Sequence, residues 1–232
     1  MRSWLSASTL LAAAAVVVGG INLGAQQPQH QRVSGRVVDH TGGPVANARI
    51  RAVALTASGG GAAAPPALRA LGAADGSFAL AGLPAGLYQL CADAPGKELL
   101  DPCLWDRLPT PISVGELPLT GKGVQLKRGA TLSIRVDDPA QALAVAEKTG
   151  KGHLLLGVWS ANGLFHPARV TAEDAAGRTY SLEIPVGVTA KLSVTPSALR
   201  VQDAAGKGLA GGAAVDVIMS PAGQAFRYTV TP

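Results

Sequence analysis

The feature that most constrains the fold is a two-residue alternation of apolar and polar side chains in short segments. In residues 33–37, 130–136 and 180–184 every second residue is apolar or glycine, and turns rich in glycine, proline or aspartate end the segments. Successive side chains of a β-strand point to opposite faces, so this pattern indicates half-buried strands. The 29 glycines and 16 prolines supply the many turns that short strands need. Only residues 139–148 look helical, and the sequence therefore predicts an all-β protein.

The strand-like segments fall into two groups, separated by a proline-rich stretch at about 95–119. Short strands at regular spacing with glycine and proline turns are typical of β-sandwiches. We therefore predict two immunoglobulin-like or transthyretin-like sandwich domains. The first covers 32–119, including the proline-rich extension, and the second covers 124–232. Residues 57–67 are low in complexity, and we expect a mobile loop there.

The first 25 residues have the pattern of a signal peptide. Arg2 precedes an unbroken apolar run at 10–18, and Ala25 offers a small residue before the expected cut at Gln26. The run is much shorter than the roughly 20 residues of a spanning helix. An uncleaved anchor remains the alternative. We expect a secreted or periplasmic protein with no membrane span after signal cleavage.

The net charge of +5 does not come from a concentrated basic region. Lys127-Arg128 is the only adjacent basic pair. The only mild basic patch consists of the four basic residues from Lys122 to Arg135, which have no acidic residue among them. Nucleic-acid-binding proteins carry a basic stripe, usually with aromatic residues nearby. We therefore expect no nucleic-acid partner.

Residues 33–96 carry an ordered set of short motifs. Gly35-Arg36-Val37-Val38-Asp39 precedes Gly42-Gly43-Pro44-Val45, and Asp75-Gly76-Ser77-Phe78 is followed by Leu83-Pro84-Ala85-Gly86-Leu87-Tyr88. In order and spacing this region resembles the carboxypeptidase regulatory-like domain. The resemblance implies a transthyretin-like sandwich, related to carbohydrate-binding-like folds, that often lies beside a catalytic or transport domain. Phe78 and Tyr88 are the expected large core residues, and Gly76 is expected to take a positive φ.

Cys91 and Cys103 are the only two cysteines. Export would place them in an oxidising compartment, where a disulfide forms and persists. We predict that they are bridged, and that the bridge holds the following segment, with Trp105, against the first sandwich. Two small buried thiols are the alternative.

The sequence offers no recognisable catalytic or metal-binding set. None of His30, His40, His153 and His166 has the glutamate spacing of a zinc peptidase, and no serine stands in a Gly-x-Ser-x-Gly motif. The acidic pairs 137–138 and 173–174 lack the further oxygen ligands that calcium needs, so strand-end turns are favoured. We predict no catalytic residue, no metal and no cofactor, and hence a protein that is not an enzyme.

Binding remains, and three aromatic residues are the candidates: Trp105, Trp159 and Phe165. Aromatic faces stack on sugars and anchor protein partners. For these residues a structural role is favoured, with Trp159 filling the second core and Trp105 covering the disulfide, because tryptophan is buried more often than not. The leading hypothesis is an exported, non-catalytic binding or protein-interaction module with an unknown protein or glycan partner. The alternatives are a carbohydrate-binding module, or an accessory subunit of an envelope enzyme or transporter.

Overall fold

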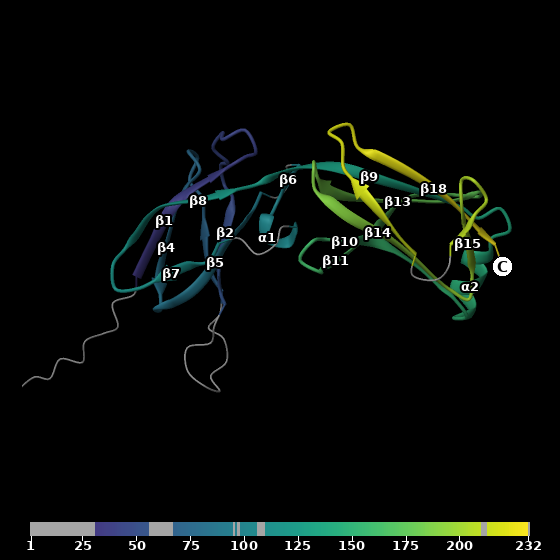
Figure 1. Ribbon diagram of the computed structural model, residues 1–232, viewed down its shortest axis with the longest axis horizontal. Helices are drawn as coiled ribbons and strands as arrows, with labels where there is room; N and C mark the ends of the chain where they lie inside the picture. Colours follow the sequence, from purple (N-terminus) through teal and green to yellow (C-terminus); the bar gives the residue numbers. More distant parts are fainter. Residues whose placement is uncertain are drawn as a thin grey trace, which may run out of the picture.

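The computed structural model describes residues 31–55, 67–94, 96, 98–105, 110–209 and 213–231. The predicted signal peptide and most of the predicted loop at 57–67 lie outside these residues. The chain forms two β-sandwiches placed end to end, which together make an arch (Figure 1). The predicted all-β class with two sandwiches is therefore confirmed.

The first sandwich consists of a three-stranded and a four-stranded sheet. In the three-stranded sheet, β1 (Gln31–Val38) pairs antiparallel with β4 (Ser77–Leu83) and parallel with β8 (Leu119–Gln125). The other sheet is antiparallel throughout and has the order β3 (Leu68–Leu71), β2 (Arg49–Ala54), β5 (Gly86–Asp93), β7 (Ile112–Val114).

The apolar positions of the alternating strands meet between these two sheets. Phe78 and Tyr88 are buried there, as predicted, and Val33 and Val37 of β1 are fully buried beside them. Gly76 has a φ of 76°, as predicted, and a Cβ at this position would lie 2.6 Å from the carbonyl oxygen of Val37. Only glycine combines this conformation with such a close approach.

The second sandwich has a larger sheet and a smaller one. The larger sheet has the order β12 (Arg169–Asp174), β13 (Gly177–Pro185), β9 (Lys127–Asp137), β18 (Gln224–Thr231), β15 (Arg200–Asp203), β16 (Gly208–Leu209). The smaller sheet has the order β11 (Phe165–Pro167), β10 (His153–Trp159), β14 (Thr189–Ser197), β17 (Ala213–Ile218). All neighbours are antiparallel except β9 and β18, which are parallel.

The helix predicted at 139–148 is α2 (Ala142–Thr149), at one end of the second sandwich. Its first turn is held by Asp138, a buried residue whose carboxylate accepts hydrogen bonds from the backbone N–H groups of Ala142 (2.7 Å) and Leu143 (2.9 Å). These are two of the N–H groups that a helix leaves without partners at its start. Asp138 thus has a structural role.

The sandwiches join with almost no linker. β8 belongs to the first sandwich and β9 to the second, and only Leu126 stands between them. Leu126 is fully buried in the first core, and its backbone N–H donates to the carbonyl oxygen of Val38 (2.8 Å). One nearly continuous β segment therefore runs from one sandwich into the other (Figure 1).

The stretch at 95–119, expected to be irregular, contains more regular structure than predicted. Besides β7 it holds β6 (Leu99–Leu100), which pairs with the start of β9, and the single helical turn α1 (Pro102–Trp105). These elements are too short to produce a periodic pattern in the sequence.

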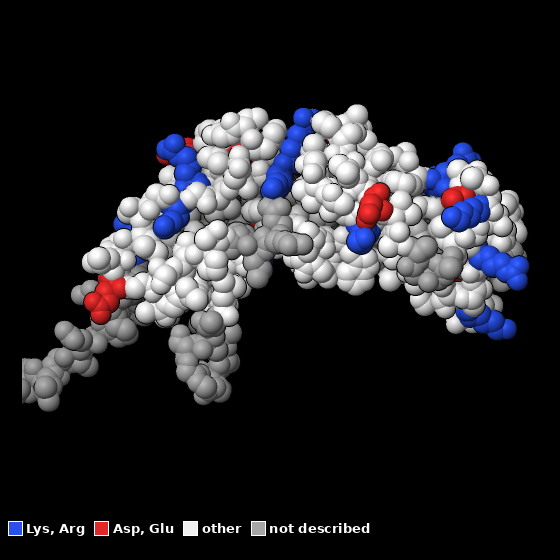
Figure 2. Space-filling view, in the orientation of Figure 1, with Lys and Arg blue, Asp and Glu red and all other residues white. Residues whose placement is uncertain are grey.

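Charged side chains are spread over the molecule. On the face shown in Figure 2, lysines and arginines lie in separate groups on both sandwiches and do not form a continuous stripe. No helix among the described residues has both the length and the apolar character that a membrane crossing requires.

Candidate functional site

The smaller sheet of the second sandwich has an inner apolar face and an outer face that carries aromatic residues. Leu156 and Val158 of β10 point into the core, so Leu155 and Trp159 point outward, and each is 45% exposed. The prediction that Trp159 fills the second core is therefore wrong, because the alternation of β10 places its side chain on the outer face. β10 is apolar on both faces because one face is buried in the core and the other carries the exposed side chains of Leu155 and Trp159.

Trp159 lies beside Phe165, its partner in the register of β10 and β11. The centroids of the two rings are 5.1 Å apart, and their planes are tilted by 52°. The Phe165 ring also lies across Gly157, because a Cβ at Gly157 would come within 2.5 Å of its Cζ atom. Glycine at 157 thus leaves room for an aromatic ring flat on the sheet. We call Trp159 and Phe165 the aromatic pair.

Polar side chains continue the outer face next to the aromatic pair. Lys191 is opposite Trp159 on β14, and Asp216 is opposite Lys191 on β17. The ammonium of Lys191 donates to Asp216 (3.1 Å) in an exposed ion pair. The next two residues on this side of β14 are Ser193, which is buried, and Thr195, which is half-buried, and their hydroxyl oxygens are 3.3 Å apart. An aromatic surface therefore borders hydrogen-bonding groups of several kinds.

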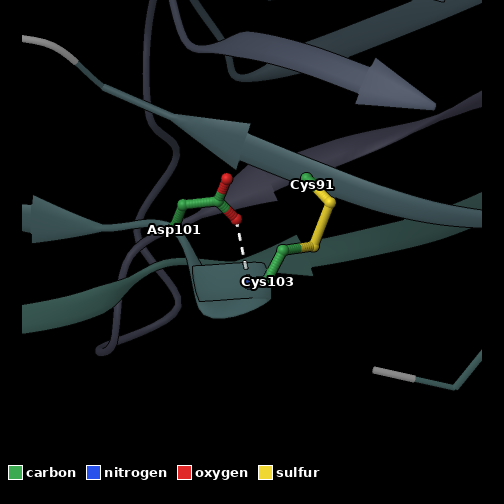
Figure 3. Close-up of side chains that lie close together, drawn as sticks. All are labelled: Cys91, Asp101 and Cys103. Atoms are coloured by element: carbon green, nitrogen blue, oxygen red, sulfur yellow. Dashed lines mark hydrogen bonds between the residues drawn. A yellow bond between two sulfur atoms is a disulfide. The ribbon is translucent and has the colours of Figure 1, made fainter. Parts of the chain in front are cut away.

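The second notable cluster surrounds the predicted disulfide, which is confirmed. Cys91 of β5 is joined to Cys103 of α1, with Cα atoms 5.6 Å apart. Asp101 lies beside it, and one carboxylate oxygen accepts from the backbone N–H of Cys103 (2.9 Å) (Figure 3). Burial raises the pKa of the Asp101 carboxyl, whose other oxygen pairs with the guanidinium of Arg51.

Cys91, Cys103 and Asp101 place their sulfur and carboxylate atoms within 4.8 Å of one another. Such a group resembles part of a metal site. Both sulfurs are bonded to each other here, however, so the oxidised protein has no thiolate to offer a metal. We assign the cluster to the disulfide.

Trp105 lies on the other side of α1 from the first sandwich. It is 4% exposed and belongs to the core of the second sandwich, where its ring stacks on His166 with 4.0 Å between centroids and 12° between planes. The prediction that the bridge holds Trp105 against the first sandwich is therefore wrong. The physical reason is that α1 bridges the junction, so that its cysteine and its tryptophan face different sandwiches.

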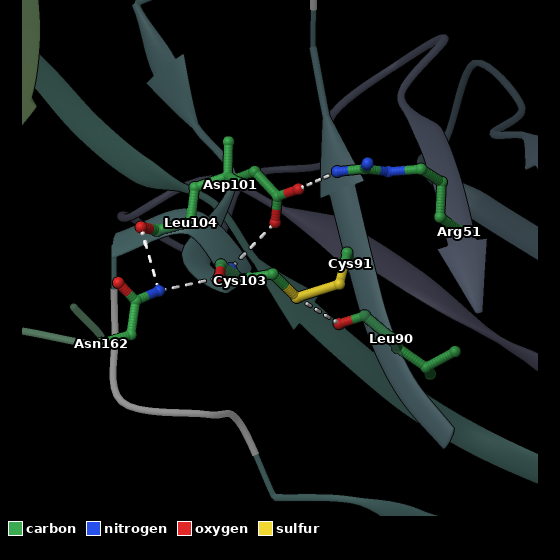
Figure 4. Close-up of a disulfide and its surroundings, with 7 residues drawn as sticks. All are labelled: Arg51, Leu90, Cys91, Asp101, Cys103, Leu104 and Asn162. Carbon is green, nitrogen blue, oxygen red and sulfur yellow. Dashed lines mark hydrogen bonds and ion pairs between the residues drawn. A yellow bond between two sulfur atoms is a disulfide. The ribbon is translucent and has the colours of Figure 1, made fainter. Parts of the chain in front are cut away.

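Hydrogen bonds add to this contact between α1 and the second sandwich. The side-chain amide of Asn162 donates to the carbonyl oxygens of Cys103 (3.2 Å) and Leu104 (3.1 Å) (Figure 4). The Nε2 atom of His166 is 3.1 Å from the same oxygen of Leu104. Because a carbonyl only accepts, Nε2 carries the proton. Burial lowers the pKa of His166, partly opposed by this hydrogen bond.

The turn at Ser160–Leu164 joins β10 to β11, and it thus connects the two clusters. Asn162 contacts α1 from this turn, while Trp159 and Phe165 flank it. Sequence reasoning identified the aromatic residues but not Asn162 or His166. A lone amide or imidazole in a turn or a short strand gives no sequence signal for a partner far away in the chain.

The remaining sequence candidates have structural partners or exposed positions. Asp137 accepts from Arg135 and Arg227, whereas Asp174 pairs with Arg135 and Glu173 with Arg178. Both acidic pairs thus take part in local contacts of the larger sheet, with Asp138 at α2 as described above. His40 and His153 are exposed, and His30 lies outside the described residues.

The comparisons with known proteins concern mainly the first sandwich. The model of the carboxypeptidase regulatory-like domain matches residues 32–102. The first sandwich carries this domain. The matched residues extend from β1 to β6 and include Cys91, while β7 and β8 complete the sheets of the first sandwich beyond the match. No curated protein matches the sequence.

Solved structures resemble the chain only distantly. A streptococcal ancillary pilin is 12% identical with a TM-score of 0.42, over 88% of this chain and 63% of its own length. A minor pilin of Streptococcus agalactiae is 11% identical with a TM-score of 0.40, over 87% of this chain and 97% of its own. A DUF3823 family protein from Bacteroides uniformis is 13% identical with a TM-score of 0.31, over 82% of this chain and 100% of its own. Similarities at this level carry no argument about function.

Proposed function

We propose that this protein is an exported, non-catalytic binding module that contacts its partner through the outer face of the β11-β10-β14-β17 sheet. The observation that carries the proposal is the exposed aromatic pair on that face. Tryptophan is among the residues that most often dominate binding energy, particularly where neighbouring groups exclude water around it. A half-exposed tryptophan supported by a second ring is therefore a suitable anchor for a partner.

The aromatic pair is also held in place before any partner binds. Phe165 rests on Gly157, and the turn between the two rings is hydrogen-bonded to α1 through Asn162. A rigid anchor loses little conformational freedom on binding, which favours affinity. The disulfide supports the exported location, because such bonds persist in oxidising compartments.

A pull-down with the mature protein from the envelope fraction of the source cell tests the proposal. Trp159→Ala and Phe165→Ala should lose a partner that the unmodified protein retains. Val170→Ala is the matched control, because Val170 is an apolar residue of β12, 49% exposed, on the other sheet. If all four proteins retain the same partner, the binding face is assigned wrongly.

A carbohydrate ligand is the second candidate, favoured by the polar row beside the rings. The apolar face of a sugar ring stacks on an aromatic side chain, while its hydroxyls need donors and acceptors nearby. Lys191, Asp216 and Thr195 provide these on the same outer face. A glycan array probed with the mature protein and with Trp159→Ala separates this candidate from a protein partner. A signal that depends on Trp159 supports it, and an array without signal contradicts it.

A further inference from the structure

The segment 98–105, which we call the clasp, leaves the first sandwich after β5 and reaches the second before the chain returns to β7 in the first. Its two short elements contact both sandwiches (Figures 1 and 4). Leu99 packs against the first core, and the next residue, Leu100, packs against the second. The clasp therefore lies at the boundary of the two modules.

The clasp is bound to the second sandwich by many independent contacts. β6 pairs with the start of β9, and the N–H of Gly129 donates to the carbonyl oxygen of Glu98 (2.8 Å). Trp105 is buried in the second core and stacks on His166, and Asn162 holds two carbonyl oxygens of α1. No single bond in this set decides whether the clasp stays attached to the second sandwich.

The contacts of the clasp with the first sandwich are fewer. Besides the packing of Leu99, the described residues give the Cys91–Cys103 bond, the pair of Asp101 with Arg51 of β2, and two weaker contacts with the backbone of β5. These two are a hydrogen bond from Ala92 to the Asp101 carboxylate and the approach of the Cys103 sulfur to the carbonyl oxygen of Leu90 (3.4 Å). The covalent bond is the strongest of these links, and it is also the one that a thiol reductant can open. β5 does not need it, because its register with β2 runs from Asp93 to Tyr88.

We propose that the Cys91–Cys103 disulfide is a thiol-controlled clasp that decides whether the two sandwiches move as one body. When it is oxidised, α1 links β5 to the core of the second sandwich. When it is reduced, α1 stays with the second sandwich, and the first sandwich moves relative to it about the β8–β9 junction at Leu126. Relative motion is the usual behaviour of domains whose interface is small.

The chemistry is thiol–disulfide exchange with a dithiol reductant, either a small molecule or a protein. Cys103 is half-buried whereas Cys91 is buried, so the thiolate of the reductant attacks the Cys103 sulfur. The sulfur–sulfur bond breaks, and Cys91 leaves as a thiolate that takes up a proton. The second thiol of the reductant then displaces Cys103, which yields two protein thiols and the oxidised reductant. Solvent supplies that proton, because the nearby Asp101 carboxylate is paired with Arg51 and accepts hydrogen bonds at both oxygens.

The aromatic pair and α1 both stay with the second sandwich, so the movement leaves the turn between the rings attached to α1 and changes only the position of the first sandwich relative to the aromatic pair. Control of ligand binding by the clasp rests on the proposed function, whereas the movement itself does not. The two ideas therefore fail separately: the movement is measured without any ligand, and partner capture is measured without a change of redox state.

Nuclear magnetic resonance relaxation and small-angle X-ray scattering of the mature protein test the clasp. Three samples are compared: oxidised protein, protein reduced with dithiothreitol, and the variant Cys91→Ser/Cys103→Ser. Alkylation confirms that the thiols react only after reduction. We expect one common rotational correlation time in the oxidised protein. In the other two samples each sandwich should tumble separately, with correlation times falling toward about half, as for independent domains.

Two controls separate the clasp from a simple stabilising bridge. Dithiothreitol should change nothing further in the double serine variant, and the amide spectrum of both sandwiches should stay dispersed in all samples. Identical correlation times and scattering curves in the oxidised and reduced protein would overturn the proposal. The proposal is also overturned if either sandwich loses its dispersed amide spectrum on reduction, whether or not the double serine variant folds.

Discussion

His166 contacts two residues of the clasp, and these contacts depend on the protonation state of its imidazole. Its ring is stacked on Trp105, and its Nε2–H donates to the carbonyl oxygen of Leu104. Burial lowers its pKa in the folded protein below the ordinary value of 6.5. The folded structure thus favours the neutral imidazole, which keeps the donor toward α1 without placing a charge in the edge of the core.

The pH dependence of stability follows from that shift. In the unfolded chain His166 titrates near 6.5, so below this pH the unfolded state binds more protons than the folded state does. The contribution of His166 is complete above about pH 6.5 and decreases as the pH falls toward the lower pKa of the folded state. The melting temperature of the unmodified protein should therefore drop between pH 7.5 and 5.5 by more than that of His166→Gln. Equal slopes for both proteins would show that His166 is not responsible.

The pairing of β1 with β8 depends on the glycine at position 35. It pairs with β8 across a register irregularity between Val33 and Gly35, and a Cβ at Gly35 would lie only 1.6 Å from the carbonyl oxygen of Lys122. A side chain at 35 therefore requires β8 to move away. Since β8 leads directly into β9, such a shift would also disturb the junction between the sandwiches.

Gly35→Ala should lower the free energy of unfolding of the first sandwich by about 1–3 kcal/mol or more, as overpacking does. Gly123→Ala is the matched control on β8, because nothing lies within 4 Å of a Cβ built there. Its effect should stay within about 0.5 kcal/mol, as for most surface substitutions. Urea titration of both variants measures the difference. A Gly35→Ala variant as stable as the control would contradict the close approach of β1 and β8.

A sequence pattern predicts a strand well when the strand is long enough for its residues to alternate several times between a buried and an exposed face. The alternation in 33–37 and 130–136 located β1 and β9 because one face of each strand is buried. The disulfide was predictable from the number of cysteines and the expected export. β6 and α1 were not, because two to four residues contain no period, and the destination of Trp105 depends on how two separately folded sandwiches meet.

At the scale of the whole molecule, the sandwiches are held together by a buried strand junction and by the clasp. Leu126 belongs to the first core, whereas Trp105 belongs to the second although Cys103, two residues before it, is bonded to the first. Each sandwich thus contributes residues to the packing at the boundary. Unfolding one sandwich therefore exposes residues of the other that are buried at the boundary. Because of this shared burial, we expect the two sandwiches to unfold cooperatively.

Trp105→Ala should reduce this coupling while leaving the disulfide intact. Replacing a buried tryptophan by alanine removes about 3–5 kcal/mol, and here the loss falls on the second sandwich and on its link to α1. Differential scanning calorimetry of the mature protein should show one transition before the substitution and two after it, with the second sandwich melting first.

Leu104→Ala is the control for that experiment, because Leu104 is the neighbouring residue of α1 and is exposed. It should keep the single transition and shift it by no more than a surface substitution does. Because Trp4 belongs to the expected signal peptide, the mature Trp105→Ala variant retains only Trp159, whose fluorescence then reports the melting of the second sandwich alone. A single transition at the original temperature in Trp105→Ala would show that the tryptophan contributes nothing to the coupling, and that the strand junction at Leu126 holds the two sandwiches together by itself.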